Sequence, residues 1–388
     1  MQKRDCKKNE SDLILKTHIT YIISNINKAL AFEWIAEYLD KEKFELNFIL
    51  LNSEDSELEC YLTKNNISVE RITYRGKRDI PKAIFRTCKI FKKHKTNIVH
   101  THLFDANLVG LFAAWLTQIP KRIYTRHHST YHHEYFSSAV KYDKMCNYFA
   151  TDIIAISENV LNVLSELEEV PLAKIHLIHH GFKLDLFNNV SPTNIEALRV
   201  KYNINGAPDE SPIIGVISRY TEWKGVQFII PAFKKLLEKH PNAVLILANA
   251  GGNYSTEIKK QLERIPKNNY REILFEKDLF SLYKIFDYFV HVPINDHAEA
   301  FGQIYVEALA AGIPSVFTIS GIACEFISNE NNAIVVNYNN SDDIYDALIL
   351  LLNNKTLLEQ IIIQGKADVK NLFELNTMIQ KLEKLYLY

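Results

Sequence analysis

The chain has 388 residues, of which 47% are hydrophobic and 23% are charged, a balance typical of a soluble globular protein and not of a disordered one. Its 45 basic residues are matched by 46 acidic residues, which excludes a whole-chain polycation and argues against nucleic acid as a partner. The length suits two domains of roughly 150–200 residues each.

The cysteines and the apolar runs indicate the compartment. Five cysteines without a close pair favour a reducing environment over a disulfide frame or a zinc knuckle. The N-terminus is charged, and no run approaches the ~20 apolar residues that a membrane-spanning helix needs. We therefore expect a cytoplasmic protein without a signal peptide, which at most rests on the inner face of a membrane.

Short apolar runs rich in β-forming residues alternate with longer segments of helical periodicity, which predicts parallel sheets covered by helices. In the first half, the expected strands cover residues 17–23, 46–51, 68–74, 97–100, 122–125, 153–156 and 175–178. The expected helices between them cover residues 29–39, 80–93, 106–116, 140–150 and 158–168.

A turn-rich segment that is poor in apolar residues, 203–212, interrupts this alternation, and we place a domain boundary there. Strands are then expected at residues 213–217, 243–248, 273–275, 288–292, 315–318 and 333–336. The sequence thus predicts an α/β fold of two doubly wound, Rossmann-like domains, 1–205 and 206–371, with a central cleft for ligands. A final helix within residues 372–388 is expected to pack back on the first domain.

The most informative segment begins at Glu299 and ends at Pro314. Gly302 allows a ligand to approach the backbone, and the free N–H groups of the helix expected after it favour an anion such as a phosphate. Glu299 precedes this helix and Glu307 lies within it, so that both carboxylates can accept hydrogen bonds from hydroxyls around one bound anion. Two glutamates at this spacing are also common as solvated surface charges.

A second motif consists of the strand 213–217, a loop that carries Arg219 and Lys224, and the start of a helix. Doubly wound folds bind ligands at the carboxyl ends of their strands. Two cations placed there can stabilise the negative charge of a departing diphosphate without a metal. The alternative is a surface loop whose two cations point into solvent.

These two segments resemble the retaining glycosyltransferases of family 4, whose GT-B fold has two facing Rossmann-like domains. The family signature of Glu, seven residues and Glu stands here in its full context, from Glu299 through Gly312 to Pro314. The resemblance implies that Glu299 contacts the donor sugar and that Glu307 contacts the ribose. It also implies that two cations five residues apart hold the diphosphate.

The resemblance extends these roles to further residues. In the C-terminal, donor-binding domain it adds the loop residues Ala300, Phe301 and Gly302. In the N-terminal, acceptor-side domain, His127 ends an expected strand and would lie beside the reacting sugar, so that His127 and Glu299 are the catalytic candidates. No covalent nucleophile is implied. The acceptor-side candidates are Lys28, His128 and His132.

The chain also departs from the family pattern. After the first strand the family has a Gly-Gly loop that closes over the donor, whereas residues 24–30 here contain no glycine. The loop 273–279 is shorter than the family's base-contacting loop and lacks its glycine, so the base is not indicated. His180 stands where the family usually has asparagine.

The predicted function is transfer of a sugar from a nucleotide-diphosphate sugar to an acceptor hydroxyl, with retention, in polysaccharide or glycolipid assembly. No Asp-x-Asp occurs in the sequence, so metal-independent transfer without a cofactor is expected. The predicted partners are the donor, as co-substrate, and a sugar or lipid-linked sugar acceptor. The alternatives are a sugar-nucleotide epimerase or sensor of the same fold, and a metal-dependent hydrolase. The metal ligands of such a hydrolase would come from His100, His102, Asp105, His127 and His180.

One further feature is a run of cations over residues 75–93, which continues into an amphipathic helix with Ile84, Cys88 and Phe91 on its apolar face. A basic amphipathic helix can contact anionic lipid at a membrane surface. The alternative is an ordinary surface helix of an α/β domain.

Overall fold

The computed structural model describes residues 16–204 and 211–388, which form two compact units. The first unit contains the described residues up to Thr125, together with Tyr142–Ile154 and Lys381–Tyr388. The second contains Arg126–Lys141 and Ala155–Gln380. Each unit is therefore assembled from more than one segment of the chain.

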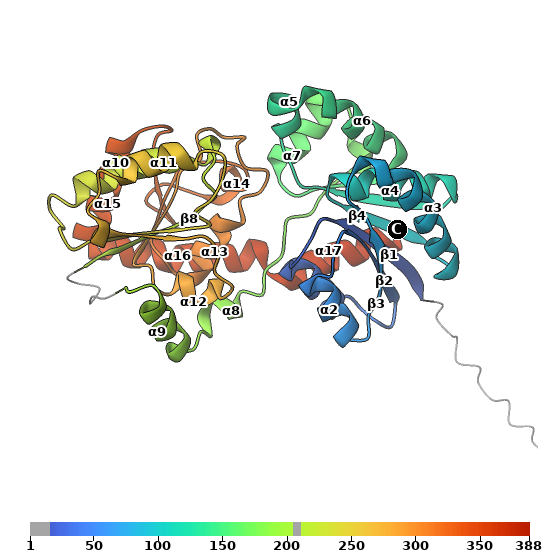
Figure 1. Ribbon diagram of the computed structural model, residues 1–388, viewed down its shortest axis with the longest axis horizontal. Coiled ribbons are helices and arrows are strands. Elements are labelled where there is room, and N and C mark those ends of the chain that lie inside the picture. Colours follow the sequence, from blue (N-terminus) through green and yellow to red (C-terminus); the bar gives the residue numbers. More distant parts are fainter. Residues whose placement is uncertain (1–15, 205–210) are drawn as a thin grey trace, which may run out of the picture. The chain divides into compact units, whose positions relative to one another are not determined.

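A parallel sheet forms the centre of the first unit (Figure 1). Its strands within this unit are β1 (Thr17–Ser24), β2 (Phe44–Asn52), β3 (Ser68–Thr73), β4 (Ile98–His102), β5 (Lys121–Arg126) and β6 (Asp152–Ala155). They lie in the order β3-β2-β1-β4-β5-β6, and β1 pairs in parallel with both β2 and β4. This reversal of strand order beside β1 is the doubly wound arrangement that the alternating pattern predicts.

Helices cover this sheet and bury their apolar faces on it. They are α1 (Leu30–Tyr38), α2 (Glu57–Lys64), α3 (Ile80–Lys93), α4 (Phe104–Leu116) and α6 (Val140–Phe149). Helices α3 and α4 lie side by side (Figure 1). Because α3 is amphipathic, Ala83, Ile90 and Phe91 are buried while its lysines stay exposed.

The end of the chain belongs to the first unit. Helix α17 (Leu375–Leu387) carries Tyr386, whose hydroxyl lies 2.8 Å from Nδ1 of His100 and is hydrogen-bonded to the hydroxyl of Tyr21. The backbone N–H of Asp40 donates to Oε1 of Glu383 at 2.9 Å. These contacts attach the last residues to strands β1 and β4 and to the end of α1.

The second unit is built on a sheet of strands in the order β10-β9-β8-β11-β12-β13, paired in parallel. The strands are β8 (Ile213–Ile217), β9 (Val244–Ala248), β10 (Tyr270–Ile273), β11 (Tyr288–His291), β12 (Ser315–Phe317) and β13 (Ile334–Val335). Its helices are α10 (Val226–Leu236), α11 (Ser255–Leu262), α12 (Leu279–Tyr283), α13 (Gln303–Ala311), α14 (Ala323–Phe326), α15 (Ser341–Asn353) and α16 (Lys355–Phe373).

Helices cover both faces of this second sheet. In Figure 1, α10, α11 and α15 lie on one face, and α12, α13 and α16 lie on the other. The central strands β8 and β9 are rich in β-branched and aliphatic residues, and Ile214, Val216 and Leu245 pack with helix residues in one core. The unit also contains α5 (Tyr131–Tyr135), α7 (Glu158–Asn162), β7 (Ile175–Leu177), α8 (Asp185–Asn188) and α9 (Pro192–Lys201).

The predicted fold class, α/β with two parallel sheets, is confirmed. One strand was placed wrongly: residues 273–275 were expected to be extended, but β10 is Tyr270–Ile273. Leu274 and Phe275 lie beyond it in a loop and are 77% and 67% exposed, so this apolar run does not belong to the core. The helix expected at 158–168 is α7 followed by a turn of π-helix, Val163–Leu167.

The predicted domain boundary between residues 205 and 206 lies outside the described residues, and the division at that point stays a prediction. The β8–β13 sheet lies entirely after this segment, and the β1–β6 strands lie entirely before it. Among the described residues, no helix combines the length and the apolar character that crossing a membrane requires.

Candidate active site

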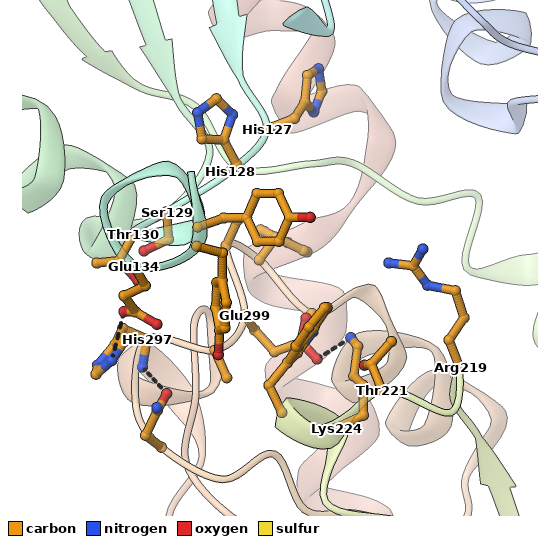
Figure 2. A pocket seen from close by; sticks show the side chains of 18 of the residues that line it. His127, His128, Ser129, Thr130, Glu134, Arg219, Thr221, Lys224, His297 and Glu299 are labelled. Atoms are coloured by element: carbon orange, nitrogen blue, oxygen red, sulfur yellow. Dashed lines mark hydrogen bonds and ion pairs between the residues drawn. The ribbon is translucent and has the colours of Figure 1, made fainter. Parts of the chain in front are cut away.

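A pocket of about 660 Å³ opens in the second unit, and separate parts of the sequence line it (Figure 2). Residues 127–135 follow β5, residues 219–224 follow β8, residues 252–253 follow β9, and residues 295–304 join β11 to α13. Three of these segments leave the carboxyl ends of parallel strands in the second sheet, where α/β folds bind ligands. This pocket is therefore the candidate active site.

Hydrogen bonds from distant side chains hold the backbone at Glu299. The Glu299 N–H donates to Oγ of Ser320 at 3.0 Å, and Nδ2 of Asn159 donates to the Glu299 carbonyl oxygen at 2.9 Å. Oγ of Ser157 donates to the carbonyl oxygen of Ala300 at 2.5 Å. Because the backbone N–H and the carbonyl oxygen of Glu299 are both hydrogen-bonded, the direction in which its side chain leaves the backbone is fixed.

Two glycines shape the turn that leads into α13. Gly302 has a φ of +83° and forms the N-cap, and the following residues, Gln303 and Ile304, line the pocket. Gly321 has a φ of +58°, and a Cβ there would lie 2.8 Å from the carbonyl oxygen of Phe301. The turn thus depends on backbone conformations that favour glycine, and it directs the N-terminus of α13 toward the pocket.

Glu299 is ionised and paired with a cation. Its Oε1 lies 2.5 Å from Nζ of Lys224 and 3.1 Å from Nε2 of His291. Burial alone would raise the pKa of the Glu299 carboxyl, but the charge of Lys224 and the hydrogen bond from His291 outweigh it and lower the pKa to about 2. The pocket therefore holds a carboxylate and an ammonium group side by side.

The loop after β8 carries the two predicted cations. Arg219 is exposed, and Lys224 ends a 3-10 turn, Glu222–Lys224; both side chains line the pocket (Figure 2). Gly225 follows with a φ of +71°, and a Cβ there would lie 1.8 Å from the carbonyl oxygen of Val292. Only glycine lets this turn lie against the strand end of β11, which places Lys224 beside Glu299.

Glu307, the second glutamate of the motif, has different surroundings. It lies inside α13, is 8% exposed, and its Oε2 accepts a hydrogen bond from the Tyr283 hydroxyl at 2.8 Å. Burial raises the pKa of its carboxyl to about 7, although the hydrogen bond from Tyr283 acts in the opposite direction. Glu307 is not among the residues that line the pocket, so the structure brings Glu299, Arg219 and Lys224 together there without it.

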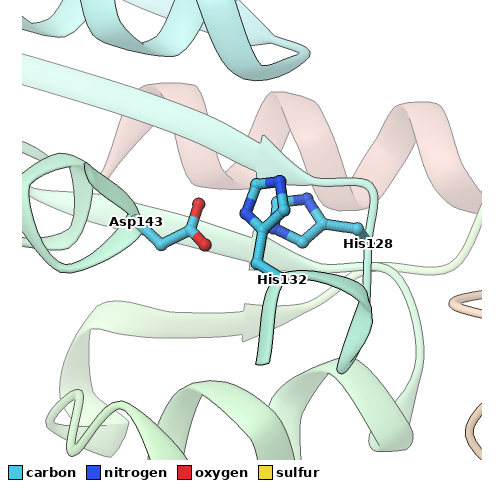
Figure 3. Close-up of side chains that lie close together, drawn as sticks. All are labelled: His128, His132 and Asp143. Carbon is cyan, nitrogen blue, oxygen red and sulfur yellow. The ribbon is translucent and has the colours of Figure 1, made fainter. Parts of the chain in front are cut away.

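The histidines after β5 occupy different positions relative to the pocket. His127 and His128 line it, opposite Lys224 in Figure 2, and the ring of His127 stacks on that of His180 with centroids 5.7 Å apart. His132 is not a lining residue, but its ring lies 4.1 Å from that of His128 (Figure 3). Of the predicted histidines, His127 and His128 therefore share the pocket with Glu299.

A buried ion pair supports this histidine segment. Nη2 of Arg126 lies 2.5 Å from Oε1 of Glu168, and both side chains are almost fully buried. Nε of Arg126 donates to the carbonyl oxygen of His128 at 3.1 Å, and Nε2 of His133 lies 3.2 Å from the same Glu168 oxygen. Loss of either partner would leave the other charge buried and unpaired. The pair therefore attaches residues 126–133 to Glu168, which follows the π-helical turn after α7.

Two residues that the sequence offered as site candidates, Lys28 and His100, belong to the first unit. Lys28 pairs with Glu57 at 3.9 Å, within that unit. His100, which the hydrolase alternative needs as a metal ligand, has Nδ1 2.8 Å from the Tyr386 hydroxyl and Nε2 2.8 Å from Oγ1 of Thr125. Both ring nitrogens of His100 are thus occupied by hydroxyl groups of the protein, which argues against a metal ligand at this position.

Sequence reasoning missed the residues that hold the site in place. Ser157, Asn159 and Ser320 bind the backbone of the Glu299 loop, and His291 binds its carboxylate. Short polar side chains carry no periodic signal, so a single sequence could not distinguish them from surface residues. The one available signal was Gly321, because an isolated glycine after a strand marks a close approach of backbone.

Two family models match successive parts of the chain, and the second match begins before the predicted boundary. "Glycosyltransferase Family 4" matches residues 34–186, and "Glycosyl transferases group 1" matches residues 199–368. The second match contains Arg219, Lys224 and the whole segment from Glu299 to Pro314.

Relatives match over nearly the whole length. The capsular polysaccharide biosynthesis glycosyltransferase CapM of Staphylococcus aureus is 26% identical over 90% of this chain and 91% of its own. An Escherichia coli UDP-Gal:alpha-D-GlcNAc-diphosphoundecaprenol alpha-1,3-galactosyltransferase is 25% identical over 90% and 91%. The crystal structure of Anabaena Alr3699/HepE in complex with UDP and glucose, 20% identical, superimposes with a TM-score of 0.80 over 95% of this chain and 98% of that one. The chain therefore belongs to the group 1, family 4 glycosyltransferases and has their GT-B fold.

Proposed function

We propose that this glycosyltransferase moves a sugar from a nucleoside-diphosphate sugar to an acceptor hydroxyl, with retention of the anomeric configuration and without a metal. The observation that carries the proposal is the pocket in which Arg219, Lys224, Glu299 and the N-terminus of α13 meet. Each of these groups can bind or stabilise part of a nucleoside-diphosphate sugar as the diphosphate leaves.

The diphosphate is proposed to bind between Arg219, Lys224 and the first N–H groups of α13. All three sources of positive potential line the same pocket. When the bond between sugar and diphosphate breaks, negative charge grows on the leaving oxygen, and fixed cations and helix dipoles stabilise it without reorganisation. Because these groups can stabilise the leaving diphosphate, we propose that transfer is metal-independent.

The sugar and ribose are proposed to bind the two glutamates. Glu299, held ionised by Lys224, would accept hydrogen bonds from hydroxyls of the donor sugar, with the backbone of Ala300, Phe301 and Gly302 around it. Glu307 would accept from the ribose, a role taken from the family resemblance. A ribose hydroxyl would then donate a hydrogen bond to the buried Glu307 carboxylate, whose pKa burial raises to about 7.

His127 is proposed to donate a hydrogen bond to the donor sugar from the opposite wall. The support is its place in the pocket and its stacking on His180, which fixes the ring plane. No covalent nucleophile is proposed. His128 and His132, and Lys28 from the first unit, are proposed on the acceptor side.

The pathway and donor are proposed from the relatives. CapM is named for capsular polysaccharide biosynthesis, the E. coli relative for transfer from UDP-Gal to a diphosphoundecaprenol-linked sugar, and the Anabaena structure holds UDP and glucose. These names support a UDP-sugar donor and a sugar or lipid-linked sugar acceptor in polysaccharide or glycolipid assembly. Such an acceptor fits a cytoplasmic enzyme.

A peripheral membrane contact belongs to the same proposal. Helix α3 exposes Lys82, Arg86 and Lys89, and the ring of Phe85, 60% exposed, stands among them with Nζ of Lys89 4.4 Å from its centroid. Cations around an exposed ring suit an anionic lipid surface. Sedimentation with phosphatidylglycerol vesicles, but not with phosphatidylcholine vesicles, is expected, and Phe85→Ser should weaken it.

The test of the proposed function is a thermal-shift screen of the purified protein against UDP-glucose, UDP-galactose and UDP-N-acetylglucosamine, followed by assay of UDP release. A bound donor raises the melting temperature by mass action. We expect one donor to stabilise the protein and release UDP in the presence of EDTA, and the anomeric signal of the product to show retention. Interconversion of the UDP-sugars would instead indicate an epimerase, stabilisation without turnover a sensor, and no stabilisation by any donor would contradict the proposal.

A further inference from the structure

Three aromatic rings form one part of the pocket wall. Tyr131 and Tyr135 lie on α5, and Trp223 lies in the 3-10 turn after β8. The centroid of the Trp223 ring is 5.3 Å from that of Tyr135 and 6.0 Å from that of Tyr131, and the two tyrosine rings are 5.6 Å apart. We refer to Tyr131, Tyr135 and Trp223 as the aromatic wall.

The aromatic wall is not sealed by protein. Tyr131 is 39% exposed and Tyr135 is 48% exposed although both rings border a pocket. Mutual packing therefore accounts for only part of each ring surface. Aromatic side chains left open in this way are a common feature of binding sites, because they offer a large, rigid apolar face with few rotatable bonds.

Polar groups stand beside these rings. Oε1 of Glu134 lies 3.0 Å from Nε2 of His297 (Figure 2). Oδ1 of Asn295 accepts from the backbone N–H of His297 at 3.3 Å. All three side chains line the pocket together with the rings. The site thus combines apolar faces with hydrogen-bonding groups at their edge.

The position of the aromatic wall connects it to the proposed chemistry. Trp223 directly precedes Lys224, whose ammonium group lies 2.5 Å from Glu299 Oε1. Trp223 and Lys224 both line the pocket, so a ligand on the Trp223 ring would lie near the cation proposed to hold the diphosphate. The second substrate must approach the bond that breaks, so a site beside Lys224 is suited to an acceptor.

We propose that Tyr131, Tyr135 and Trp223 form the acceptor subsite and that they bind a carbohydrate ring. A pyranose ring has one face of C–H groups and an edge of hydroxyls, so it matches an aromatic face bordered by a carboxylate and an amide. This inference rests on the proposed function and specifies the chemistry of its acceptor. The terminal sugar, rather than a lipid chain behind it, is what this wall recognises.

The lining itself separates a sugar from a lipid chain. An acyl or prenyl chain needs a continuous apolar groove, but Glu134, Asn295 and His297 line the same pocket as the rings. Burying a charged or amide group against a hydrocarbon chain is unfavourable. A sugar satisfies these groups with its hydroxyls.

The experiment measures binding of methyl β-glycosides of glucose, galactose and N-acetylglucosamine by saturation-transfer NMR, with UDP at saturating concentration. The variants are Trp223→Phe, which keeps a ring, and Trp223→Leu, which keeps apolar area without one. Tyr135→Leu repeats the test at a second position. Tyr148→Ala, a 76% exposed tyrosine of the first unit, is the matched control. Melting temperatures verify that each variant is folded.

The fluorescence of Trp223 reports whether the glycoside binds at the aromatic wall. The chain has three tryptophans, so a Trp34→Phe/Trp115→Phe background leaves Trp223 as the only one. We expect at least one glycoside to shift this fluorescence and to receive saturation on its C–H face. Trp223→Leu and Tyr135→Leu should each weaken that glycoside's binding by about tenfold, whereas Trp223→Phe and Tyr148→Ala should change it little.

Several results would overturn the inference. One is that no glycoside in the panel perturbs Trp223. Another is that Trp223→Leu binds the glycoside as wild type does while octan-1-ol competes with it, which would indicate a lipid site. Loss of UDP binding in Trp223→Leu would assign the aromatic wall to the donor base. Failure of UDP to bind the wild-type protein would contradict the proposed function itself, so the two failures are distinguishable.

Discussion

The molecule contains two polar clusters at strand ends that look alike in the sequence but differ in structure. In the first unit, His100 lies between the hydroxyls of Tyr386 and Thr125 and is 1% exposed. In the second unit, Glu299 and Lys224 form an ion pair that borders a pocket of about 660 Å³. Both clusters combine a titratable group with close hydrogen-bonding partners.

The surroundings of the two clusters distinguish a structural cluster from a binding site. Burial lowers the pKa of His100 to about 3, so the ring is neutral and its two nitrogens are used within the protein. Such a cluster attaches the C-terminal residues to the sheet. At the pocket, by contrast, Arg219 and the N-terminus of α13 offer positive potential toward an open space. Orientation toward an opening, more than residue type, marks the candidate site.

The largest expected effect is on the open cluster. Glu299→Gln keeps the shape of the side chain but removes the charge that pairs with Lys224 and that would accept hydrogen bonds from the donor sugar. We expect sugar transfer to fall by about 100-fold or more, measured as UDP release. The control is Glu257→Gln on the surface of α11. Turnover of Glu299→Gln within a few-fold of wild type would remove Glu299 from the site.

The second prediction compares one histidine from each cluster. His127→Ala should lower turnover by about 10- to 100-fold while the melting temperature stays near that of wild type. His100→Ala should do the reverse, because it leaves the Tyr386 and Thr125 hydroxyls buried without a partner and costs about 1–3 kcal/mol of stability. Thermal unfolding and UDP release, measured on both variants, test the pair. If the two variants behaved alike, the distinction between the clusters would be wrong.

The third prediction concerns pH and the two glutamates of one motif. The pKa of Glu307 rises from its ordinary value of 4.5 to about 7 on folding, so the folded state binds the proton more tightly than the unfolded chain does. Wild-type stability contributed by this group should therefore fall as pH rises from about 4.5 to about 7. Glu307→Gln, which has no proton to lose, should be more stable than wild type above this range, by on the order of 1–3 kcal/mol.

Denaturant unfolding of wild type and Glu307→Gln between pH 5 and pH 8 measures this difference. Glu257→Gln serves again as the surface control and should follow the wild-type profile. A constant difference between wild type and Glu307→Gln across the range would show that the carboxyl does not titrate there.

The smallest expected effect comes from the support of the open cluster. Asn159→Ala removes the hydrogen bond to the Glu299 carbonyl oxygen but leaves Ser157 and Ser320 in place. We expect kcat to fall by a few-fold with little change in donor affinity, because one of three supports is lost. Ser165→Ala, whose hydroxyl bonds its own helical turn, is the control. A larger fall in donor affinity than in kcat would contradict a positioning role.

Much of the fold was predictable, since most of its elements have a strong local pattern. The strand at 213–217 and the helix at 80–93 match β8 and α3 because a buried parallel strand and an amphipathic helix each have a clear period. β10 was misplaced since it is an edge strand, and the apolar Leu274 and Phe275 beyond it are exposed. Helix α5, only five residues long, has too few turns to show a period.

The candidate site was predictable only where a motif combines several residues at a fixed spacing. Glu299, Gly302 and Lys224 were found in this way. The burial of Glu307 beside Tyr283 was not, because the two residues are brought together by the packing of α12 on α13. The aromatic wall was missed for the same reason, since Trp223 and Tyr135 are 88 residues apart in the sequence and meet only in the folded unit.

Lys224 is proposed to belong to a diphosphate site, and titration calorimetry with UDP measures its contribution to binding. Wild type should bind UDP, and Lys224→Ala should bind it at least about tenfold more weakly, since one charge-assisted contact to the diphosphate is lost. Lys234→Ala, an exposed lysine of α10, should bind like wild type. Equal UDP affinity in wild type and Lys224→Ala, with both proteins folded, would show that Lys224 does not bind the diphosphate.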